Sequence, residues 1–568
     1  MLDGFPDIER DGPDACLASE EWRIRNLYMW EDMDTGKIVA AKLRPEQSYF
    51  LDHNHTRNFI LKCRKIGFST FEIIRALDKC IFNVDESGRN GNFLAALIDK
   101  GLGDAEKKLN IARVAWKEGI NHPDQRIAAI WLEIRRRVTL IVDNQSEMRW
   151  SNGSSIQVGT SFRGGTPRQL HISEFGYIAA NTPEKAIEIV DGAINAVPPT
   201  GRITIETTHE GGRWGKCFDM AEIAMGSKGK QISSIDWKFF FFPWYEHPSY
   251  KIQEDEELTS DLKKYFDELE NNPSDELKDY FKRIGSNEIP RERKNWYAKT
   301  YKVLQFGMFK EFPTTESEAF MSQIQGAIYP EMITLRAKGR VMSLTPEQGC
   351  PLHIFCDIGI SDFMAAWLAQ ITPMARMFHD HYEREGINAY TLAAKIHEWH
   401  SQFCRDADNP VPMGKVFLPH DADKRAPGDG KTFKNHLEEG LKNQFVGLRA
   451  PMVVVVPRTS DIWNGISAVR RLVLPNAYFD PRCDVSRKVN GINLPSGIGC
   501  LQGYHKQPPG ASGSLREEPA HDLCSHSADA FRTCGEAMER NMLQTANNYV
   551  PAESRPRDTA GRLSGAGL

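Results

Sequence analysis

Short apolar runs separated by amphipathic stretches recur in two parts of the chain. In the first part, residues 58–63 have the pattern of a buried strand, and a glycine turn and a helical pattern over residues 70–79 follow. A similar alternation begins again at residue 352. Strands alternating with helices predict a parallel α/β sheet in the first part and a second α/β domain in the other. The other expected strands are residues 138–143, 155–159, 169–173 and 202–207, and then 352–356, 363–370, 375–383, 415–418 and 452–456.

These patterns predict five segments. Two α/β domains are separated by a stretch that combines an aromatic run with charged helical patterns, and a last helix is expected over residues 526–540. The C-terminal tail is rich in Pro, Gly, Ser and Arg, which predicts disorder. The expected segments are a helical preface (1–40), the first α/β domain (41–225), a helical and aromatic subdomain with linker (226–345), the second α/β domain (346–540) and the tail (541–568).

Composition narrows the classes of function. The 568 residues carry 71 Lys and Arg against 76 Asp and Glu, a net charge of −5, which excludes a globally basic nucleic-acid-coating protein but allows a local basic channel. No apolar stretch approaches 18 residues, the sequence starts without a secretory signal pattern, and the 11 cysteines form no CxxC pair. We therefore expect a cytosolic protein. Candidate DNA contacts, which solvated helix faces would explain equally well, are Arg135, Arg136, Arg137 and Arg149, and Lys424, Arg425 and Lys431.

Residues 62–70 contain the parts of a phosphate-binding loop. A turn at Gly67 leads into a helix that opens with Ser69 and Thr70, so backbone N–H groups and the helix dipole would face an anion while a hydroxyl binds Mg²⁺. Phe68 stands where the usual loop has lysine. A basic loop before an ordinary helix is the alternative. The missing positive charge would come from Lys62, Arg64 or Lys65.

The strand over residues 169–173 ends on an acid, Glu174. A carboxylate at this place in nucleotide hydrolases orients Mg²⁺ or the attacking water beside the γ-phosphate. Ser173 occupies the position where Asp is usual. A surface glutamate that merely follows a core strand is the alternative interpretation.

Three acids follow predicted elements of the second α/β part. Asp357 ends its first strand, Asp421 follows a later strand, and Asp529 lies near the start of the last helix. Converging carboxylates of this kind can hold two Mg²⁺ or Mn²⁺ ions that cut a phosphodiester, as in RNase H-like folds. Taken singly, each acid could serve a bend, a turn cap or a helix dipole. Further candidates are Asp362, Asp423, Asp522 and His526.

The order and spacing of these motifs resemble the large terminase subunit of tailed bacteriophages. Residues 62–70, 160–174 and 207–211 look like its deviant Walker A, arginine finger, Walker B and coupling motifs. The segments around Asp357 (D-x-G-x-x-D), Asp421 (Pro-His-Asp-Ala) and Asp529 (Ser-His-x-Ala-Asp-Ala-x-Arg) match its nuclease domain. The inter-domain region also fits, so the resemblance covers roughly residues 40 to 540.

The resemblance implies an α/β fold with an N-terminal ASCE/RecA-like P-loop ATPase domain and a C-terminal RNase H-like nuclease domain. Gln47 would read adenine, Arg64 would be the P-loop arginine, and Ser69 or Thr70 would supply the Mg²⁺ hydroxyl. Arg163 would be a finger that reaches a neighbouring subunit's nucleotide, although a contact with DNA or a local carboxylate is the alternative. Thr207-Thr208-His209 would relay the loss of γ-phosphate.

The implied function is that of a viral DNA-packaging motor subunit, which hydrolyses ATP to translocate double-stranded DNA into a procapsid and cuts the concatemer. The implied cofactors are ATP with Mg²⁺, and Mg²⁺ or Mn²⁺ in the nuclease. The implied partners are DNA, a small terminase subunit, a portal protein and a ring of five copies, in the host cytoplasm and transiently at the portal. Two alternatives remain: an ATP-dependent nuclease of DNA repair or defence, and a non-catalytic DNA-binding scaffold with a degenerate nucleotide site.

Overall fold

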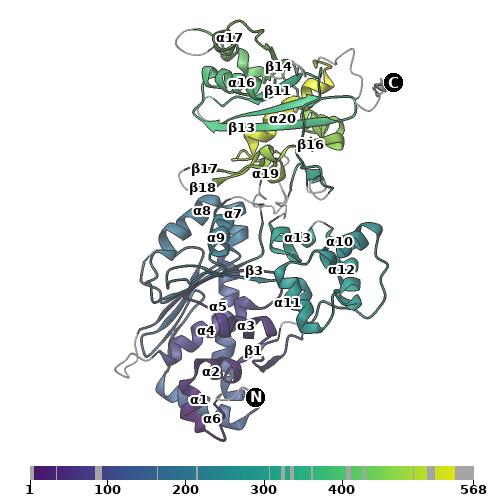
Figure 1. Cartoon of the computed structure of the whole chain (residues 1–568). Coiled ribbons are helices and arrows are strands. Elements are labelled where there is room, and N and C mark those ends of the chain that lie inside the picture. The colour runs from purple at the N-terminus through teal and green to yellow at the C-terminus, as the bar shows by residue number, and fades with distance from the viewer. Residues whose placement is uncertain are drawn as a thin grey trace, which may run out of the picture. The chain divides into compact units, whose positions relative to one another are not determined.

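The computed structural model describes most of the chain, which forms two compact units (Figure 1). The first unit comprises Met1–Gln325 with Lys488–Leu494, and the second comprises Gly326–Arg487 with Pro495–Leu568. In the described part, no helix is both long and apolar enough to span a membrane. The structure describes all residues except 1–5, 33–34, 84–91, 163, 211, 213–214, 306, 321–325, 333–334, 336–337, 360–362, 405–410, 426–429, 490–491, 508–517 and 544–568.

An eight-stranded sheet forms the centre of the first unit, in the order β10-β3-β9-β8-β4-β7-β6-β5. Neighbouring strands from β10 to β7 pair in parallel, whereas β7, β6 and β5 pair antiparallel. The strands are β3 (Arg57–Lys62), β4 (Leu94–Ile98), β5 (Leu140–Asp143), β6 (Glu147–Trp150), β7 (Ser155–Gly159), β8 (Gln169–Ser173), β9 (Arg202–Thr207) and β10 (Lys238–Phe242).

The order of the parallel strands defines the class of this unit. One strand, β9, lies between β3, which precedes the predicted phosphate loop, and β8, which ends beside Glu174. This insertion of a strand between the two is the RecA-like, ASCE arrangement, so the predicted fold class of the unit is confirmed. Because the strands are parallel, the carboxyl ends of β3, β8 and β9 meet at the same edge of the sheet.

Helices cover both faces of this sheet because alternate strand residues point to opposite sides. Ile60 of β3 packs into one core with residues of α4 and α5, whereas Phe59 and Leu61 pack into another with residues of α7, α8 and α9. The first unit also contains α1 (Gly12–Ala18), α2 (Glu20–Asn26), β1 (Met29–Glu31), β2 (Ile38–Ala40), α3 (Pro45–His53), α4 (Phe68–Phe82), α5 (Leu102–Glu118), α6 (Gln125–Arg137), α7 (Phe175–Asn181), α8 (Pro183–Glu188), α9 (Gly215–Met225), α10 (Ser260–Asn271), α11 (Asp275–Ile284), α12 (Arg291–Leu304), α13 (Gly307–Glu311) and α14 (Glu316–Ala319).

The aromatic run at residues 239–242 is part of the sheet of the first unit. This corrects the prediction that the run belongs to a separate helical and aromatic subdomain. The run forms the edge strand β10, which pairs in parallel with β3. Phe239 stacks on Phe59 with ring centroids 6.1 Å apart, and Phe242 lies 4.9 Å from Phe68. A strand with large rings on both faces can be buried on both sides of a sheet.

The second unit is built on a six-stranded sheet in the order β15-β14-β11-β12-β13-β16. Helix α20 packs on one face of this sheet, where the ring centroids of Phe531 and Trp367 lie 5.3 Å apart. Helices α16 and α17 pack on the other face. This is the RNase H-like arrangement, as predicted. The elements are β11 (Leu352–Asp357), β12 (Phe363–Ile371), β13 (Arg376–Glu385), α16 (Ala389–Phe403), β14 (Met413–Leu418), α17 (Phe433–Gln444), β15 (Met452–Val455), α18 (Ile462–Ala468), β16 (Ala477–Phe479), α19 (Gly497–Gly503) and α20 (Ser525–Glu539). The strands β17 (Arg487–Val489) and β18 (Ile492–Leu494) pair with each other and, except for Arg487, belong to the first unit.

Parallel pairing does not extend over the whole of either sheet. In the second unit, β11, β12 and β13 pair antiparallel, and only β14, β15 and β16 join by parallel pairing. The connection between β12 and β13 is a tight turn closed by the Thr372 N–H and the Ala375 carbonyl oxygen at 2.9 Å. So short a connection cannot cross over, because a parallel pair needs a dozen or more connecting residues.

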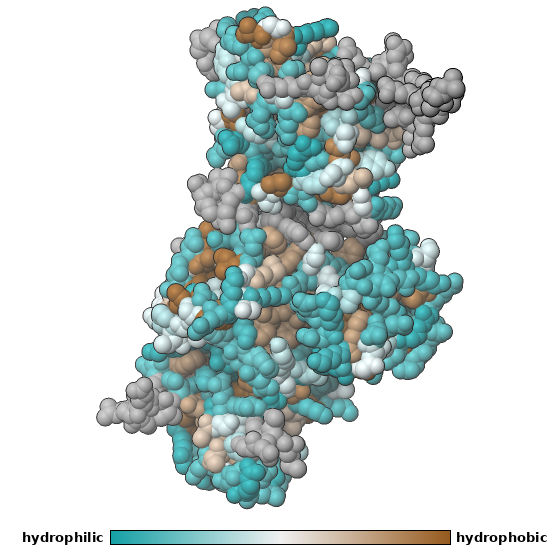
Figure 2. All heavy atoms as spheres, in the orientation of Figure 1, coloured by the Kyte–Doolittle hydropathy of each residue, from teal (hydrophilic) through white to brown (hydrophobic). Residues whose placement is uncertain are grey.

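The apolar side chains lie mainly inside the two units. The face in view in Figure 2 is mostly hydrophilic, with smaller apolar areas scattered over it. This distribution is ordinary for a folded protein, whose surface keeps single apolar groups.

Candidate functional site

The loop after β3 has the backbone of a phosphate-binding turn. Gly67 caps α4 with φ +82°, and Lys65 is also left-handed, with φ +61°. A left-handed glycine lets the chain turn sharply into the helix without a side-chain clash. Ser69 and Thr70 then lie in the first turn of α4, where free backbone N–H groups and the helix dipole favour an anion.

Phe68 brings no charge to this loop, because its side chain is apolar and packs into the interior. Its ring lies 5.4 Å from that of Phe50 and 4.9 Å from that of Phe242, and it is 1% exposed. The position that usually carries the loop lysine therefore belongs to the core in this chain. A cation for a nucleotide has to come from another residue.

The three predicted cations are placed differently. Lys62 is buried, with Nζ 3.1 Å from Glu206 Oε2, whereas Arg64 and Lys65 are exposed. The Arg64 guanidinium donates to Glu311 Oε2 at 2.7 Å. Burial alone would lower the pKa of Lys62, but the nearby carboxylates of Glu206 and Glu174 outweigh it and raise that pKa. Lys62 is therefore positively charged at neutral pH.

Glu206 is the centre of this buried cluster, although the sequence does not single it out. It is fully buried on β9, and its Oε1 accepts hydrogen bonds from Ser69 Oγ at 2.6 Å and Ser173 Oγ at 2.7 Å. Burial alone would raise the pKa of Glu206, but Lys62 outweighs it and holds that pKa well below its usual range. The one signal in the sequence is an acid inside an otherwise buried strand, Arg202–Thr207.

Glu174 lies directly after β8, as predicted, in a left-handed conformation with φ +55°. Its N–H donates to the Glu206 carbonyl oxygen at 2.9 Å, and it is half-buried. A left-handed non-glycine residue stores backbone strain, which is common in functional sites. Behind it, Lys108 donates to the Ser173 hydroxyl and pairs with Asp99 at 2.5 Å. The acid end of β8 is thus held rigidly.

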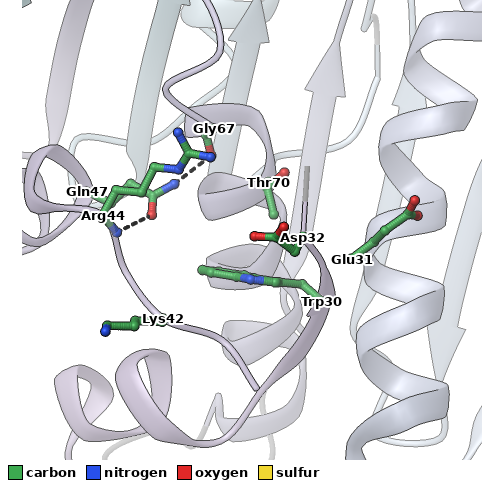
Figure 3. A pocket seen from close by; sticks show the side chains of 8 residues that line it. All are labelled: Trp30, Glu31, Asp32, Lys42, Arg44, Gln47, Gly67 and Thr70. Carbon is green, nitrogen blue, oxygen red and sulfur yellow. Dashed lines mark hydrogen bonds between the residues drawn. The ribbon is translucent and has the colours of Figure 1, made fainter. Parts of the chain in front are cut away.

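Gln47, predicted to read adenine, braces the phosphate loop. Its Nε2 donates to the carbonyl oxygens of Gly67 at 2.9 Å and Ile66 at 3.3 Å, and its Oε1 accepts the Arg44 N–H at 3.0 Å. Both ends of the amide are therefore engaged within the protein. A pocket beside these bonds is lined by Trp30, Glu31, Asp32, Lys42, Arg44, Gln47, Gly67 and Thr70 (Figure 3).

The end of β9 and the residues just after it lie close to α7, the helix that follows Glu174. Thr207 Oγ1 accepts the Gly176 N–H at 2.8 Å, and the His209 ring lies 4.8 Å from that of Phe320. Burial lowers the pKa of His209 to about 4, so the ring is neutral at physiological pH. Arg163, the predicted finger, lies outside the described residues.

Two of the three predicted nuclease acids lie close together in the second unit. Asp357 ends β11, and its Oδ2 lies 3.4 Å from His526 Nδ1. Asp529 on α20 accepts from Arg532 at 3.2 Å. Burial raises the pKa of Asp529, Arg532 opposes this shift, and Asp357 is near enough to add to it. Asp357 and Asp529 therefore face a common, partly buried region.

Asp421 lies at the same edge of the sheet. β14 pairs in parallel with β11, with Phe417 opposite Phe355, so the ends of the two strands are adjacent. Asp421 follows in a one-turn 3₁₀ helix, His420–Asp423, and its Oδ1 is buried and makes no hydrogen bond to the described residues. A buried carboxylate oxygen without a hydrogen-bond partner is stabilised by a nearby cation.

As positioned here, Asp357, Asp421 and Asp529 do not surround a common metal position. In the described part of the chain, no group of three or more acidic, histidine or cysteine residues is gathered tightly enough to hold a metal ion. The donor types still fit Mg²⁺ or Mn²⁺, because carboxylate oxygens are the ligands such ions prefer. Of the further candidates, Asp423 is exposed, Asp522 lies 3.6 Å from His505, and Asp362 is outside the described residues.

The candidate basic patches are only partly free to meet DNA. Arg136 and Arg137 pair with Glu133, and Arg149 pairs with Glu147. In the second unit Lys431 pairs with Glu439 at 2.8 Å, while Lys424 and Arg425 are exposed. Exposed pairs of this kind open at little cost.

Comparisons with known proteins are informative only at the level of structure. No family model and no curated protein sequence matches the chain. The chain is similar to the large terminase of a thermophilic bacteriophage, at 10% identity and a TM-score of 0.28, over 88% of this chain and 100% of that one. It is also similar to the large terminase nuclease domain of bacteriophage SPP1 with bound Mn (14% identity, TM-score 0.23, 34% of this chain and 87% of that one). The large terminase ATPase domain of Thermus phage P74-26 is a third (13%, 0.24, 44% and 94%). These similarities concern the fold alone.

Proposed function

We propose that this chain is a DNA-packaging motor subunit, with an ATPase in the first unit and a metal-dependent DNA endonuclease in the second. The observation that carries the ATPase is the loop at Gly67, whose first helical hydroxyl, on Ser69, is hydrogen bonded to a buried carboxylate at the carboxyl edge of a RecA-like sheet. Phosphate-binding turns place anions against such backbone N–H groups.

In the ATPase, the nucleotide phosphates lie against residues 63–70 and the adenosine part lies toward the pocket of Figure 3. Arg64 and Lys65 contact phosphate oxygens, and Gln47 fixes the loop and the edge of the base. Glu174 orients the attacking water. Ser69 or Thr70 would hold Mg²⁺, which neutralises charge that develops on the phosphates.

We place Arg163 at the nucleotide of a neighbouring copy, in a working ring of five. Such a finger supplies positive charge to the transition state only after assembly. Thr207-Thr208-His209 passes the change at the site to the rest of the unit. A small terminase subunit and a portal protein are the proposed partners, in the host cytoplasm and at the procapsid. Residues 1–40 and 541–568 are the proposed docking segments.

In the nuclease, Asp357, Asp421 and Asp529 would hold Mg²⁺ or Mn²⁺. When bound, two such ions activate water and stabilise the leaving 3′ oxygen of the cut strand. His526 orients Asp357, and Arg532 holds Asp529 in place. Lys424 and Arg425, exposed after Asp421, meet DNA phosphates without reading bases.

The purified full-length chain tests this proposal. We expect Mg²⁺-dependent ATP hydrolysis, Mn²⁺-dependent plasmid cutting, and DNA uptake when procapsids with a portal are added. Both activities without portal binding or uptake would favour a nuclease of repair or defence. Neither activity would favour a DNA-binding scaffold.

A further inference from the structure

The carboxylate that a Walker B strand normally supplies is missing from its place in this chain. In P-loop hydrolases, Mg²⁺ is held by the loop Ser or Thr together with an acid on the Walker B strand. Here the residue before Glu174 is Ser173, which has no charge. A site that binds Mg²⁺ beside Ser69 therefore needs an acid from another element.

We infer that Glu206, on the neighbouring strand β9, supplies this carboxylate and positions the Ser69 hydroxyl for Mg²⁺. The inference rests on the proposed ATPase function and assigns a role that no motif in the sequence indicates. It also selects Ser69 over Thr70 as the Mg²⁺ hydroxyl, because Ser69 Oγ is the one hydrogen bonded to Glu206, at 2.6 Å.

The register of the sheet explains why an acid on β9 can replace one on β8. Ser173 and Glu206 are direct partners across β8 and β9, and β9 lies between β8 and β3. A side chain on β9 therefore starts one strand spacing, about 4.8 Å, closer to the phosphate loop. Ser173 Oγ donates to Glu206 Oε1 at 2.7 Å, so the serine supports the displaced acid.

The buried negative charge of Glu206 is balanced by Lys62 of β3. Lys62 Nζ lies 3.1 Å from Glu206 Oε2, and both side chains are less than a tenth exposed. Apart from this ion pair, Glu206 Oε2 is buried and has no hydrogen-bond partner among the described residues. The carboxylate is therefore ionised, with two hydroxyls donating to Oε1 and the Lys62 ammonium beside Oε2.

A merely structural ion pair is the alternative, and the dependence on Mg²⁺ separates the two. Glu206→Gln keeps the shape and removes the charge. In the full-length chain we expect ATP hydrolysis to fall about 10- to 100-fold and the half-saturating Mg²⁺ concentration to rise by a similar factor, the usual effect of losing a carboxylate that orients a metal ligand. Binding of ATP in EDTA should be unchanged, since this binding does not use the metal.

Moving the acid back is the matched test. The double variant Ser173→Asp with Glu206→Gln restores the usual arrangement, and we expect it to recover at least about 10-fold of the lost hydrolysis and the Mg²⁺ dependence of the wild type. Should Glu206→Gln not fold, Lys62→Met with Glu206→Gln removes both buried charges, and it should fold and still show the raised Mg²⁺ requirement.

The outcomes are distinct. A wild-type chain that hydrolyses ATP while Glu206→Gln keeps its rate and Mg²⁺ dependence overturns this inference and leaves the ATPase standing. A Ser173→Asp, Glu206→Gln variant as impaired as the single variant overturns it as well. A wild-type chain that hydrolyses no ATP overturns both. Plasmid cutting by the second unit serves as the control for intact protein.

Discussion

The buried ion pair between Arg23 and Asp78 gives a sharp test of how the N-terminal segment is held on the first unit. Arg23 of α2 donates to Asp78 of α4 through Nε at 2.8 Å and a terminal nitrogen at 2.7 Å, and Tyr28 OH donates to the same carboxylate at 2.7 Å. Both charged side chains are almost completely buried, at 6% and 1% exposure. We predict that Asp78→Asn lowers the free energy of unfolding of this unit by about 3–5 kcal/mol.

The magnitude follows from what the amide can replace. An Asn oxygen could still accept two of the three hydrogen bonds, but its NH₂ group would face the remaining Arg23 donor, and the guanidinium would stay buried without a counter-charge. The matched control is Glu133→Gln, which removes the partner of exposed Arg137 (76% and 46% exposed) and should cost at most about 0.5 kcal/mol.

Urea unfolding, monitored by hydrogen exchange of peptides from α2 and α4, measures the free energy of unfolding of the first unit in both variants. Because β1 follows α2 and carries Trp30 of the pocket in Figure 3, the variant should also bind ATP more weakly. The apolar pair Arg23→Met with Asp78→Leu should recover most of the lost stability, since it leaves no buried charge. A loss below about 1 kcal/mol for Asp78→Asn would refute this reasoning.

Further variants separate the two sites and test the segment after β9. Asp357→Ala should reduce Mn²⁺-dependent plasmid cutting about 100-fold or more and leave ATP hydrolysis near normal; equal loss of both would contradict separate sites. Arg64→Ala should abolish ATP hydrolysis and spare cutting, and normal hydrolysis would mean that this arginine does not reach the nucleotide. Gly176→Ala should destabilise the first unit by about 1–3 kcal/mol, because its Cβ would lie 2.4 Å from the Thr208 carbonyl oxygen, whereas Gly192→Ala, with nothing within 4 Å, should be neutral. Equal melting temperatures for these two variants would contradict that contact.

Much of the fold could be predicted from the sequence because its signals are local. The apolar runs at residues 57–62 and 202–207 are short and bounded by turn residues, and both form strands. The run at residues 239–242 does not indicate a strand, because four phenylalanines in a row show no alternation of apolar and polar residues. Its burial on both faces depends on Phe59 and Phe68, which are distant in sequence. Strand direction in the second unit could not be predicted either, since it follows from connection length and not from hydrophobicity.

The candidate site divides in the same way. The loop at Gly67 and the acid Glu174 are visible in the sequence because a glycine turn, hydroxyls and a strand-ending acid follow one another. Glu206 is not, because its partner Ser69 lies 137 positions away on another element. The replacement of an acid by Ser173 is visible only as a loss, and the sheet order is needed to show which neighbouring strand can compensate for it.

The most direct test of the central claim is steady-state ATP hydrolysis by the full-length chain, with and without Mg²⁺, beside the matched variant Glu174→Gln. The account predicts Mg²⁺-dependent turnover by the wild type, and a variant that still binds ATP but hydrolyses it about 100-fold or more slowly. A wild-type rate no higher than that of the variant, at saturating Mg²⁺ and in the presence of DNA, would contradict it.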